Sequence, residues 1–265
     1  MNLFIEGLQG SGKSTLLNKF AKQYPDYPVY REGDYNPVEL AWNALLTYEQ
    51  YQKMLTKYEY LKEDIIRHTV VEDDTHIVAY TLILAENRQF YQDMEQYELY
   101  NGRVSFSHFH EVIMKRYQMY GKGNGLFECS FFQNSIETMM LFYEMNDTAI
   151  YDFYQEAFSY MKDKNFQLIY LDSENIRNSI LQIKKERVDE QGLECWFPLM
   201  MEYLKASPYG KRMGYQNLDD LIKHLARRRE LELGIIQDII KTQATILKAK
   251  QFKDDFALSV NGSNQ

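Results

Sequence analysis

Short apolar runs alternate along the chain with longer segments in which apolar residues recur at helical spacing. Residues 2–6, Asn-Leu-Phe-Ile-Glu, are the first such run, and a glycine follows them. A strand buried on both faces of a parallel sheet has this pattern, so we expect a central parallel strand here. Residues 13–24 come next and carry Leu16, Leu17 and Phe20 at helical spacing, which predicts a helix.

The same alternation recurs in the second half of the chain. Strand-like runs lie at residues 29–32, 126–130 and 166–172, and segments with helical spacing lie at 132–145, 147–163, 173–188 and 217–250. Ser173 is positioned to cap the third of these helices. Strands that alternate with helices imply βαβ units, so the expected fold class is α/β with a central parallel sheet.

Residues 43–122 interrupt this alternation. The segment is polar, rich in tyrosine and nearly free of proline and glycine, and its pattern is mainly helical with a strand-like interruption at 76–82. We interpret it as a large helical insertion in a single domain, residues 1–265, and as the region that receives a substrate or closes over it. A short last strand is predicted at residues 257–260.

The composition narrows the class of protein. With 265 residues, the chain is long enough for one large α/β domain that carries an insertion. Its net charge of −8 argues against a general nucleic-acid binder, which needs a basic surface to displace counterions. No apolar run approaches the roughly 20 residues that span a bilayer. The two cysteines, Cys129 and Cys195, imply no disulfide framework, and no signal-peptide pattern is present, so we expect a cytoplasmic protein.

Two compositional features leave alternatives open. Aromatic residues are abundant, with 22 Tyr and 15 Phe. Most are expected to build the core, and the alternative is that some of them wall a pocket for a flat ligand. The run Arg227-Arg228-Arg229 is interpreted as a solvated basic face of a helix, and the alternative is that one arginine reaches the phosphates of a ligand.

Residues 7–14, Gly-Leu-Gln-Gly-Ser-Gly-Lys-Ser, match the pattern G-x-x-x-x-G-K-[ST] between a predicted strand and a predicted helix. In this pattern the glycines let successive backbone N–H groups point at one anion, the lysine reaches the β- and γ-phosphates, and the serine hydroxyl binds Mg²⁺. The residues expected to bind ATP are Gly7, Gly10, Ser11, Gly12, Lys13, Ser14 and Thr15. We therefore expect a P-loop NTPase three-layer sandwich that uses ATP and Mg²⁺.

Acidic residues at two predicted strand ends suggest phosphoryl transfer. Arg31, Glu32 and Asp34 lie at the end of the second predicted strand, at the sheet edge where open α/β folds bind ligands. A carboxylate there is suited to accept a proton from a hydroxyl, and an arginine to hold a phosphate; an ordinary charged surface loop is the alternative. Glu128 ends the segment Leu126-Phe127-Glu128 within the strand-like run at 126–130. We expect it to share the Mg²⁺ shell with Ser14, and a helix-capping role is the alternative.

Four pieces of the chain resemble, in order, the nucleoside and nucleoside-monophosphate kinase group of P-loop proteins, thymidylate kinases in particular. Residues 6–15 resemble the group's E-G-x-x-G-x-G-K-S-T opening. Arg31-Glu32-Gly33 resembles R-E-P-G, a stretch that contacts the acceptor and the transferring phosphate, with glycine in place of proline. Glu128-Cys129-Ser130 stands where the group has D-R-S or E-R-S, with cysteine in place of arginine. Residues 168–187 resemble a strand, a helix and an arginine-bearing lid.

The resemblance implies that Arg187 closes over the phosphates, and a basic residue that complements a helix C-terminus is the alternative. It also implies an ATP-dependent kinase acting on a nucleoside, a nucleotide or a similar hydroxylated small molecule. The residues predicted to be catalytic are Lys13, Arg31, Glu32, Asp34 and Arg187, and the choice of base between Glu32 and Asp34 stays open.

A second hypothesis is a nucleotide-gated ATPase or switch whose helical insertion binds a protein partner. GTP is disfavoured as the nucleotide because the chain contains no N-K-x-D sequence. The sequence also leaves a homodimer open.

Overall fold

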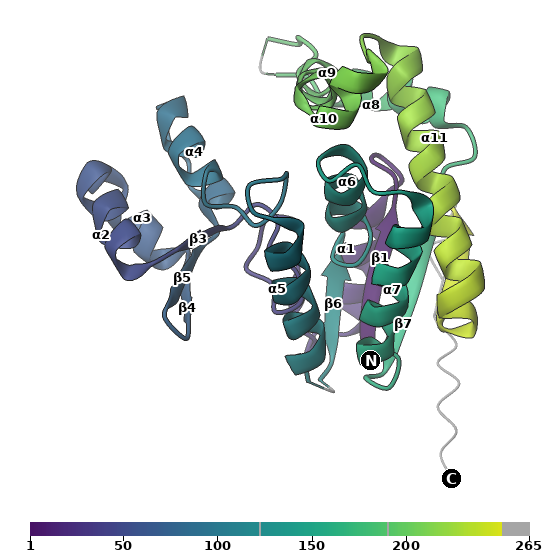
Figure 1. Ribbon diagram of the computed structural model, residues 1–265, viewed down its shortest axis with the longest axis horizontal. Coiled ribbons are helices and arrows are strands. Elements are labelled where there is room, and N and C mark those ends of the chain that lie inside the picture. The colour runs from purple at the N-terminus through teal and green to yellow at the C-terminus, as the bar shows by residue number, and fades with distance from the viewer. Residues whose placement is uncertain (122, 190, 251–265) are drawn as a thin grey trace.

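The computed structural model describes residues 1–121, 123–189 and 191–250 (Figure 1), so the strand predicted at 257–260 lies outside the described residues. Its main sheet has five parallel strands in the order β2-β6-β1-β7-β8. The strands are β1 (Asn2–Gly7), β2 (Val29–Tyr30), β6 (Gly125–Glu128), β7 (Phe166–Asp172) and β8 (Ala244–Lys248). The predicted α/β class with a central parallel sheet is therefore confirmed.

Helices flank this sheet on both faces. The α-helices are α1 (Lys13–Gln23), α2 (Tyr48–Lys57), α3 (Lys62–Arg67), α4 (Arg88–Glu95), α5 (Phe106–Met119), α6 (Gln133–Leu141), α7 (Asp147–Met161), α8 (Ile176–Glu186), α9 (Trp196–Ala206), α10 (Pro208–Met213) and α11 (Leu218–Ile235). Alternation along β1 explains the two layers, because successive side chains of a strand point to opposite faces. Leu3 and Ile5 pack in a core cluster with Leu17 of α1, whereas Phe4 packs in the cluster that contains residues of α5, α6 and α7.

Aromatic rings fill much of the core on the Phe4 face. The Phe4 ring stacks on Phe127 of β6 with 4.5 Å between centroids and on Phe166 of β7 with 4.9 Å. Tyr30 of β2 continues the stack on Phe127 at 4.9 Å. Aromatic pairs add attraction to the burial of their area, so the stack links four neighbouring strands. The expected aromatic core is confirmed for these residues.

Residues 43–122 contribute a second sheet as well as helices. Three antiparallel strands, β3 (Ala44–Leu46), β4 (Thr69–Glu72) and β5 (Thr75–Val78), are ordered β3-β5-β4. With α2, α3 and α4 they enclose a separate hydrophobic cluster, and Figure 1 shows this layer to one side of the main sheet. The α5 helix differs from the rest of the segment because its buried side chains, such as Tyr117, belong to the main core.

Three local predictions differ from the structure. The α8 helix begins at Ile176, where Asn175 rather than Ser173 is the N-cap and accepts a hydrogen bond from the Asn178 N–H. The helix predicted over 217–250 ends earlier, and residues 244–248 are the edge strand β8 because they pair with β7. The strand-like run at 76–82 is a strand only as far as Val78 and then forms a 3₁₀ turn over Tyr80–Leu82. Within the described ranges, no helix is long and apolar enough to cross a membrane.

Candidate functional site

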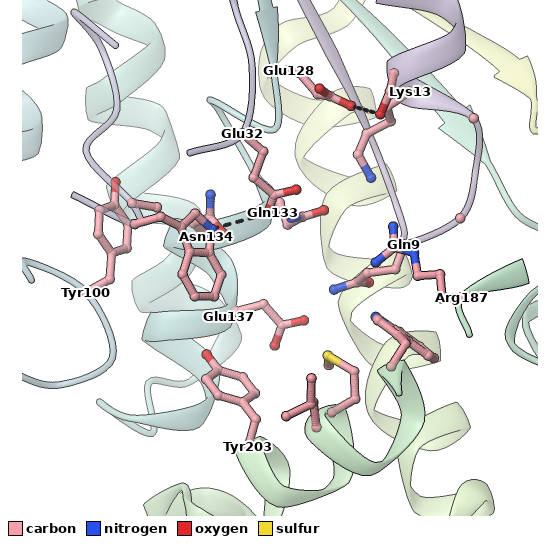
Figure 2. Close-up of a pocket in the computed structure, with 18 of the residues that line it drawn as sticks. Gln9, Lys13, Glu32, Tyr100, Glu128, Gln133, Asn134, Glu137, Arg187 and Tyr203 are labelled. Carbon is pink, nitrogen blue, oxygen red and sulfur yellow. Dashed lines mark hydrogen bonds between the residues drawn. The ribbon is translucent and has the colours of Figure 1, made fainter. Parts of the chain in front are cut away.

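A cavity of about 720 Å³ opens beyond the carboxyl end of β1 (Figure 2). In the strand order, the chain moves from β1 toward β2 at one edge of the sheet. It later crosses from β6 to β7, toward the other edge. The carboxyl end of β1 is thus a topological switch point, the position where open α/β sheets bind ligands. Figure 1 shows α8, α9 and α10 over this end of the sheet.

The glycine-rich loop forms one wall of the cavity. Gly7 and Gly12 have φ angles of 138° and 101°, which residues with a Cβ rarely adopt. A Cβ on Gly7 would also lie 2.5 Å from the carbonyl oxygen of Leu171 on β7. Gly12 is the N-cap of α1, so the helix begins at Lys13 directly beneath the loop. The glycines predicted by the motif are therefore required by the backbone geometry.

Lys13 and Ser11 present polar groups inside this loop. Lys13 is buried, and its Nζ donates hydrogen bonds to the carbonyl oxygens of Gly7 at 2.9 Å and Leu8 at 3.0 Å. An ammonium has three donors, so this arrangement leaves one of them free. The Ser11 Oγ is buried and has no hydrogen-bond partner in the part of the chain that the structure describes. A buried hydroxyl without a partner fits a loop built to receive a hydrogen-bonding ligand.

Ser14 and Glu128, the two predicted Mg²⁺ ligands, lie together. The Ser14 hydroxyl donates a hydrogen bond to Glu128 Oε1, and both residues line the cavity (Figure 2). One comes from the first turn of α1 and the other from the end of β6, so neighbouring strands supply the pair. A hydroxyl and a carboxylate offer the oxygen ligands that Mg²⁺ prefers.

The loop after β2 sends only one of its three predicted residues to the cavity. Glu32 lines the cavity and accepts hydrogen bonds from Gln133 Nε2 at 2.7 Å and from Trp42 Nε1 at 3.3 Å. Asp34 does not line the cavity, because its carboxylate accepts a hydrogen bond from the Arg31 backbone N–H at 2.9 Å and closes the turn. The Arg31 side chain also lies outside and donates to Asn18 Oδ1 at 2.7 Å.

Arg187 lies at the opposite wall as the C-cap of α8, and its side chain is exposed. It lines the cavity, and none of the ion pairs among the described residues includes it. Lys184 does not line the cavity. Its Nζ lies 3.2 Å from Glu194 Oε2 and 3.9 Å from the ring centroid of Phe197. Of the basic residues on α8 and its C-cap, Arg187 is the one that lines the cavity.

Lys250 is a cavity residue that the sequence patterns missed. Its backbone N–H donates to the Ser11 carbonyl oxygen at 3.2 Å, so the segment after β8 contacts the glycine-rich loop. Its Nζ lies 3.5 Å from Glu186 Oε1, beside Arg187. The pairing of β8 with β7 brings Lys250 here, and no local pattern signals that pairing.

The rest of the cavity has aromatic and carboxamide walls drawn from distant segments. These walls are Trp42, Tyr100, Asn101, Gln133, Asn134, Thr138, Trp196, Leu199, Met200 and Tyr203, none of which was predicted as a site residue. The abundance of tyrosine was the only signal in the sequence for such walls. Tyr100 and Tyr203 line the cavity, as the alternative interpretation of the aromatic residues expects, and a flat ligand stays a prediction.

A buried ionic network lies next to the cavity. Residues 227–229 were interpreted as a solvated basic face, and this interpretation is wrong for Arg228. Arg228 is fully buried in α11; its Nη1 lies 2.7 Å from Glu137 Oε1 and its Nε lies 2.7 Å from Glu232 Oε1. His224 Nε2 lies 2.7 Å from Glu137 Oε2. Burial opposes ionisation of Glu137, but the charges and hydrogen bonds of His224 and Arg228 lower its pKa to about 2. Arg228 Nη1 also lies 3.4 Å from Oε1 of Gln9 in the glycine-rich loop.

Two further carboxyl groups are buried beneath the cavity. Glu6 accepts a hydrogen bond from the Phe131 N–H at 2.7 Å, and burial raises its pKa to about 7. Glu39 accepts a hydrogen bond from the Ala41 N–H at 2.7 Å, and burial raises its pKa to about 8. The thiol of Cys129 is also buried, which raises its pKa well above the ordinary value, so this cysteine is a small core residue.

Elsewhere, His108 and His110 lie on α5, where His110 Nε2 is 2.9 Å from Glu156 Oε2. Ser207 caps the short helix α10, and Lys211 lies within that helix. Among the described residues, no group of three or more His, Cys, Asp and Glu is arranged to hold a metal ion. Comparison with models of protein families gives no match for this chain, and comparison with curated proteins gives none either.

Proposed function

We propose that the protein is an ATP-dependent phosphotransferase of the P-loop NTPase class that phosphorylates a hydroxylated small molecule. The observation that carries this proposal is the continuity of the cavity. The same cavity is lined by the glycine-rich loop at Lys13, by the carboxylate of Glu32 and by the aromatic walls at Tyr100. A donor site and an acceptor site that share one enclosed space are what direct phosphoryl transfer needs.

The loop residues suit a triphosphate and Mg²⁺. When bound, Mg²⁺·ATP supplies the phosphoryl group to be transferred and the cation that screens its oxygens. Lys13 has a free N–H donor for phosphate oxygens, and the unpartnered Ser11 hydroxyl adds a second donor. Ser14 and Glu128 are the residues that would hold Mg²⁺, since their oxygens already face each other.

Glu32 is the residue we assign as the base. Its carboxylate lies on the cavity wall, and its hydrogen bonds from Gln133 and Trp42 fix its orientation. From there it removes the proton of an acceptor hydroxyl as that oxygen attacks, a role worth about 10²–10⁴ in rate. Asp34 is less suited, because its carboxylate closes the turn outside the cavity.

Arg187 and Lys13 supply the positive charge for the transition state. Arg187 lies on the wall opposite Glu32 and is free of ion pairs among the described residues, so it is available to move onto the transferring phosphoryl group. Arg31, which the resemblance also implies, is bonded to Asn18 and would need a new side-chain conformation to take part.

The proposal is tested with purified protein, Mg²⁺ and ATP. ADP release is measured with and without nucleosides, nucleotides and hydroxylated antibiotics as acceptors. We expect release that depends on an acceptor and is abolished by Lys13→Ala and by Glu32→Gln. Asp34→Asn is the matched carboxylate control and keeps most of the activity. ADP release at one rate with every acceptor would instead support the nucleotide-gated switch.

A further inference from the structure

The basic residues that line the cavity are confined to one of its two halves. The basic lining residues, Lys13, Arg187 and Lys250, all belong to the glycine-rich loop or to the segments that contact it. The other half of the cavity, which extends from Glu32 away from the glycine-rich loop, is the acceptor half. None of its described lining residues is a lysine, arginine or histidine. The same half carries the carboxyl groups of Glu98 and Glu137. Among the described residues, the acceptor half is therefore lined by carboxyl groups and by no cation.

The Glu137 carboxylate is held in its charged form at this wall. In Figure 2 its side chain projects into the cavity between Gln9 and Tyr203. Arg228 and His224 lie behind it: Arg228 Nη1 is 2.7 Å from Glu137 Oε1, and His224 Nε2 is 2.7 Å from Glu137 Oε2. These two groups hold Glu137 in its charged form, but both are buried and neither lines the cavity, so the carboxylate is the charged group of this cluster that a ligand meets.

Glu98 is held by neutral groups only. Tyr80 donates its hydroxyl hydrogen to Glu98 Oε1 at 2.6 Å, and Asn101 Nδ2 donates to Glu98 Oε2 at 3.3 Å. The carboxyl group is buried, which raises its pKa to about 7. Tyr203 donates to Asn101 Oδ1 at 2.9 Å and connects this group to the aromatic wall. A cation in the cavity would stabilise the Glu98 carboxylate, because no lysine or arginine in the described residues forms an ion pair with it.

A polar atom on the same wall lacks a hydrogen-bond donor. Gln133 is 5% exposed, and its Nε2 is used by Glu32. Its Oε1 is buried and has no partner within the described ranges. A carbonyl oxygen accepts hydrogen bonds, so the ligand that completes it must offer an N–H or O–H group.

Within the described residues, this half has no lining cation that could receive a phosphorylated acceptor. Arg31 is bonded to Asn18 outside the cavity. The position after Glu128 is Cys129, which is buried in the core. A phosphate monoester would thus enter a half that repels it, because its charge has the same sign as that of the lining carboxylates.

We infer that the acceptor is an unphosphorylated hydroxyl compound that bears a protonated amine, with the amine held by Glu137 and Glu98. The inference rests on the proposed function and names its substrate class. The carboxylates attract the ammonium, the rings of Trp42, Tyr100 and Tyr203 offer faces for a flat or cationic group, and Gln133 Oε1 accepts a hydrogen bond. Loss of hydration of the ammonium is offset because Glu137 is already charged and fixed.

The test is a binding series on the full chain, by calorimetry, with Mg²⁺ and a non-hydrolysable ATP analogue present. The probes are adenosine, thymidine, their 5′-monophosphates and their 3′-amino-3′-deoxy derivatives. We expect each amino derivative to bind about 10-fold tighter than its parent and each monophosphate about 10-fold weaker, which is about 1.4 kcal/mol in either direction. Monophosphates that bind as tightly as the parents, or amino derivatives that show no advantage, overturn the inference.

Failure of the proposed function is recognised separately. In that case the ATP analogue shows no Mg²⁺-dependent binding to the wild-type chain, or it binds the Lys13→Ala variant as tightly as the wild type. The ordering of the acceptor probes is read in calorimetric affinities, so it does not depend on turnover.

Variants assign the preference to the two carboxylates. Glu137→Gln and Glu98→Gln should each reduce the amine advantage, and a thermal melt identifies any variant that fails to fold. Glu98→Gln is the safer variant, because the amide oxygen still accepts from Tyr80 and no buried cation loses its partner. Glu202→Gln is the matched control: Glu202 is exposed on α9 and does not line the cavity, so its loss of charge should leave the preference unchanged.

Discussion

Gln133 Nε2 donates a hydrogen bond to Glu32 Oε1 across 2.7 Å. The bond joins the first residue of α6 to the loop after β2, two segments that are 101 positions apart in the sequence. Gln133 is buried, whereas Glu32 is exposed to the cavity. A fixed donor beneath a reactive carboxylate reduces its rotation, which gives Gln133 a positioning role in the proposed reaction.

Replacement of Gln133 should therefore lower kcat without weakening ATP binding. Gln133→Met keeps the volume of the side chain but removes the donor, and we expect a fall of about 10-fold in kcat with KM for ATP unchanged. Glu32→Gln should cost about 100-fold or more. The double variant should be no slower than Glu32→Gln alone, since Gln133 acts through Glu32. Additive losses in this double-mutant cycle would show that the two residues act independently.

Glu128→Gln should raise the Mg²⁺ concentration needed for activity. The amide has no charge, so a cation held between Ser14 and residue 128 loses most of its attraction, and we expect a half-saturating Mg²⁺ concentration about 10-fold higher. The measurement is the rate of ADP release over a Mg²⁺ titration. Glu186→Gln, which changes a carboxylate on the α8 side of the same cavity, is the control and should shift the titration much less.

Arg228→Met should strongly destabilise the fold. The substitution leaves Glu137 and Glu232 buried without their guanidinium partner, a loss that costs about 3–5 kcal/mol in comparable buried pairs. Urea denaturation measures the change in the free energy of unfolding. Arg227→Met is the matched control. Its partner Asp147 is largely exposed, so we expect a cost of about 0–1 kcal/mol. Equal costs for the two variants would contradict the importance of the buried network.

The stability of the fold should fall as the pH rises from 4.5 toward 8. Glu6 and Glu39 have ordinary pKa values of 4.5 that burial raises to about 7 and about 8. The folded state therefore binds protons that the unfolded state has already released, and stability decreases over this range. Glu137 acts in the opposite sense, because its pKa is lowered to about 2, and its contribution is lost as the pH falls from 4.5 through 2.

Together these groups place the stability maximum at about pH 4. Thermal melts between pH 3 and pH 9 measure it. Glu39→Gln should flatten the decline on the alkaline side, since the amide keeps the hydrogen bond from Ala41 but has no proton to lose. A decline of unchanged steepness in this variant would show that Glu39 is not responsible.

The sequence by itself determined the features that depend on neighbouring residues. The strand, glycine-rich loop and helix over residues 2–23 follow from the local spacing of apolar residues and from the glycines at positions 7 and 12. The structure holds both glycines at positive φ angles, which other residues rarely adopt. The alternation of strands and helices follows in the same way, because each short apolar run by itself predicts a buried strand. Ser14 and Glu128 were predicted to share a Mg²⁺ shell from the phosphate-binding pattern and from the acidic residue that P-loop proteins place at this strand end, and the structure brings the two side chains together.

Tertiary structure alone decided which side chains face the cavity. Glu32 and Asp34 are two positions apart, and a turn closed by the Asp34 carboxylate directs one inward and keeps the other out. Arg228 was interpreted as part of a solvated face, but it is buried because it pairs with Glu137, which lies 91 positions away in the sequence. Residues 244–248 are a strand only because β7 offers them a free edge. Local patterns carry no information about such partners, since burial and pairing depend on segments that only the folded chain brings together.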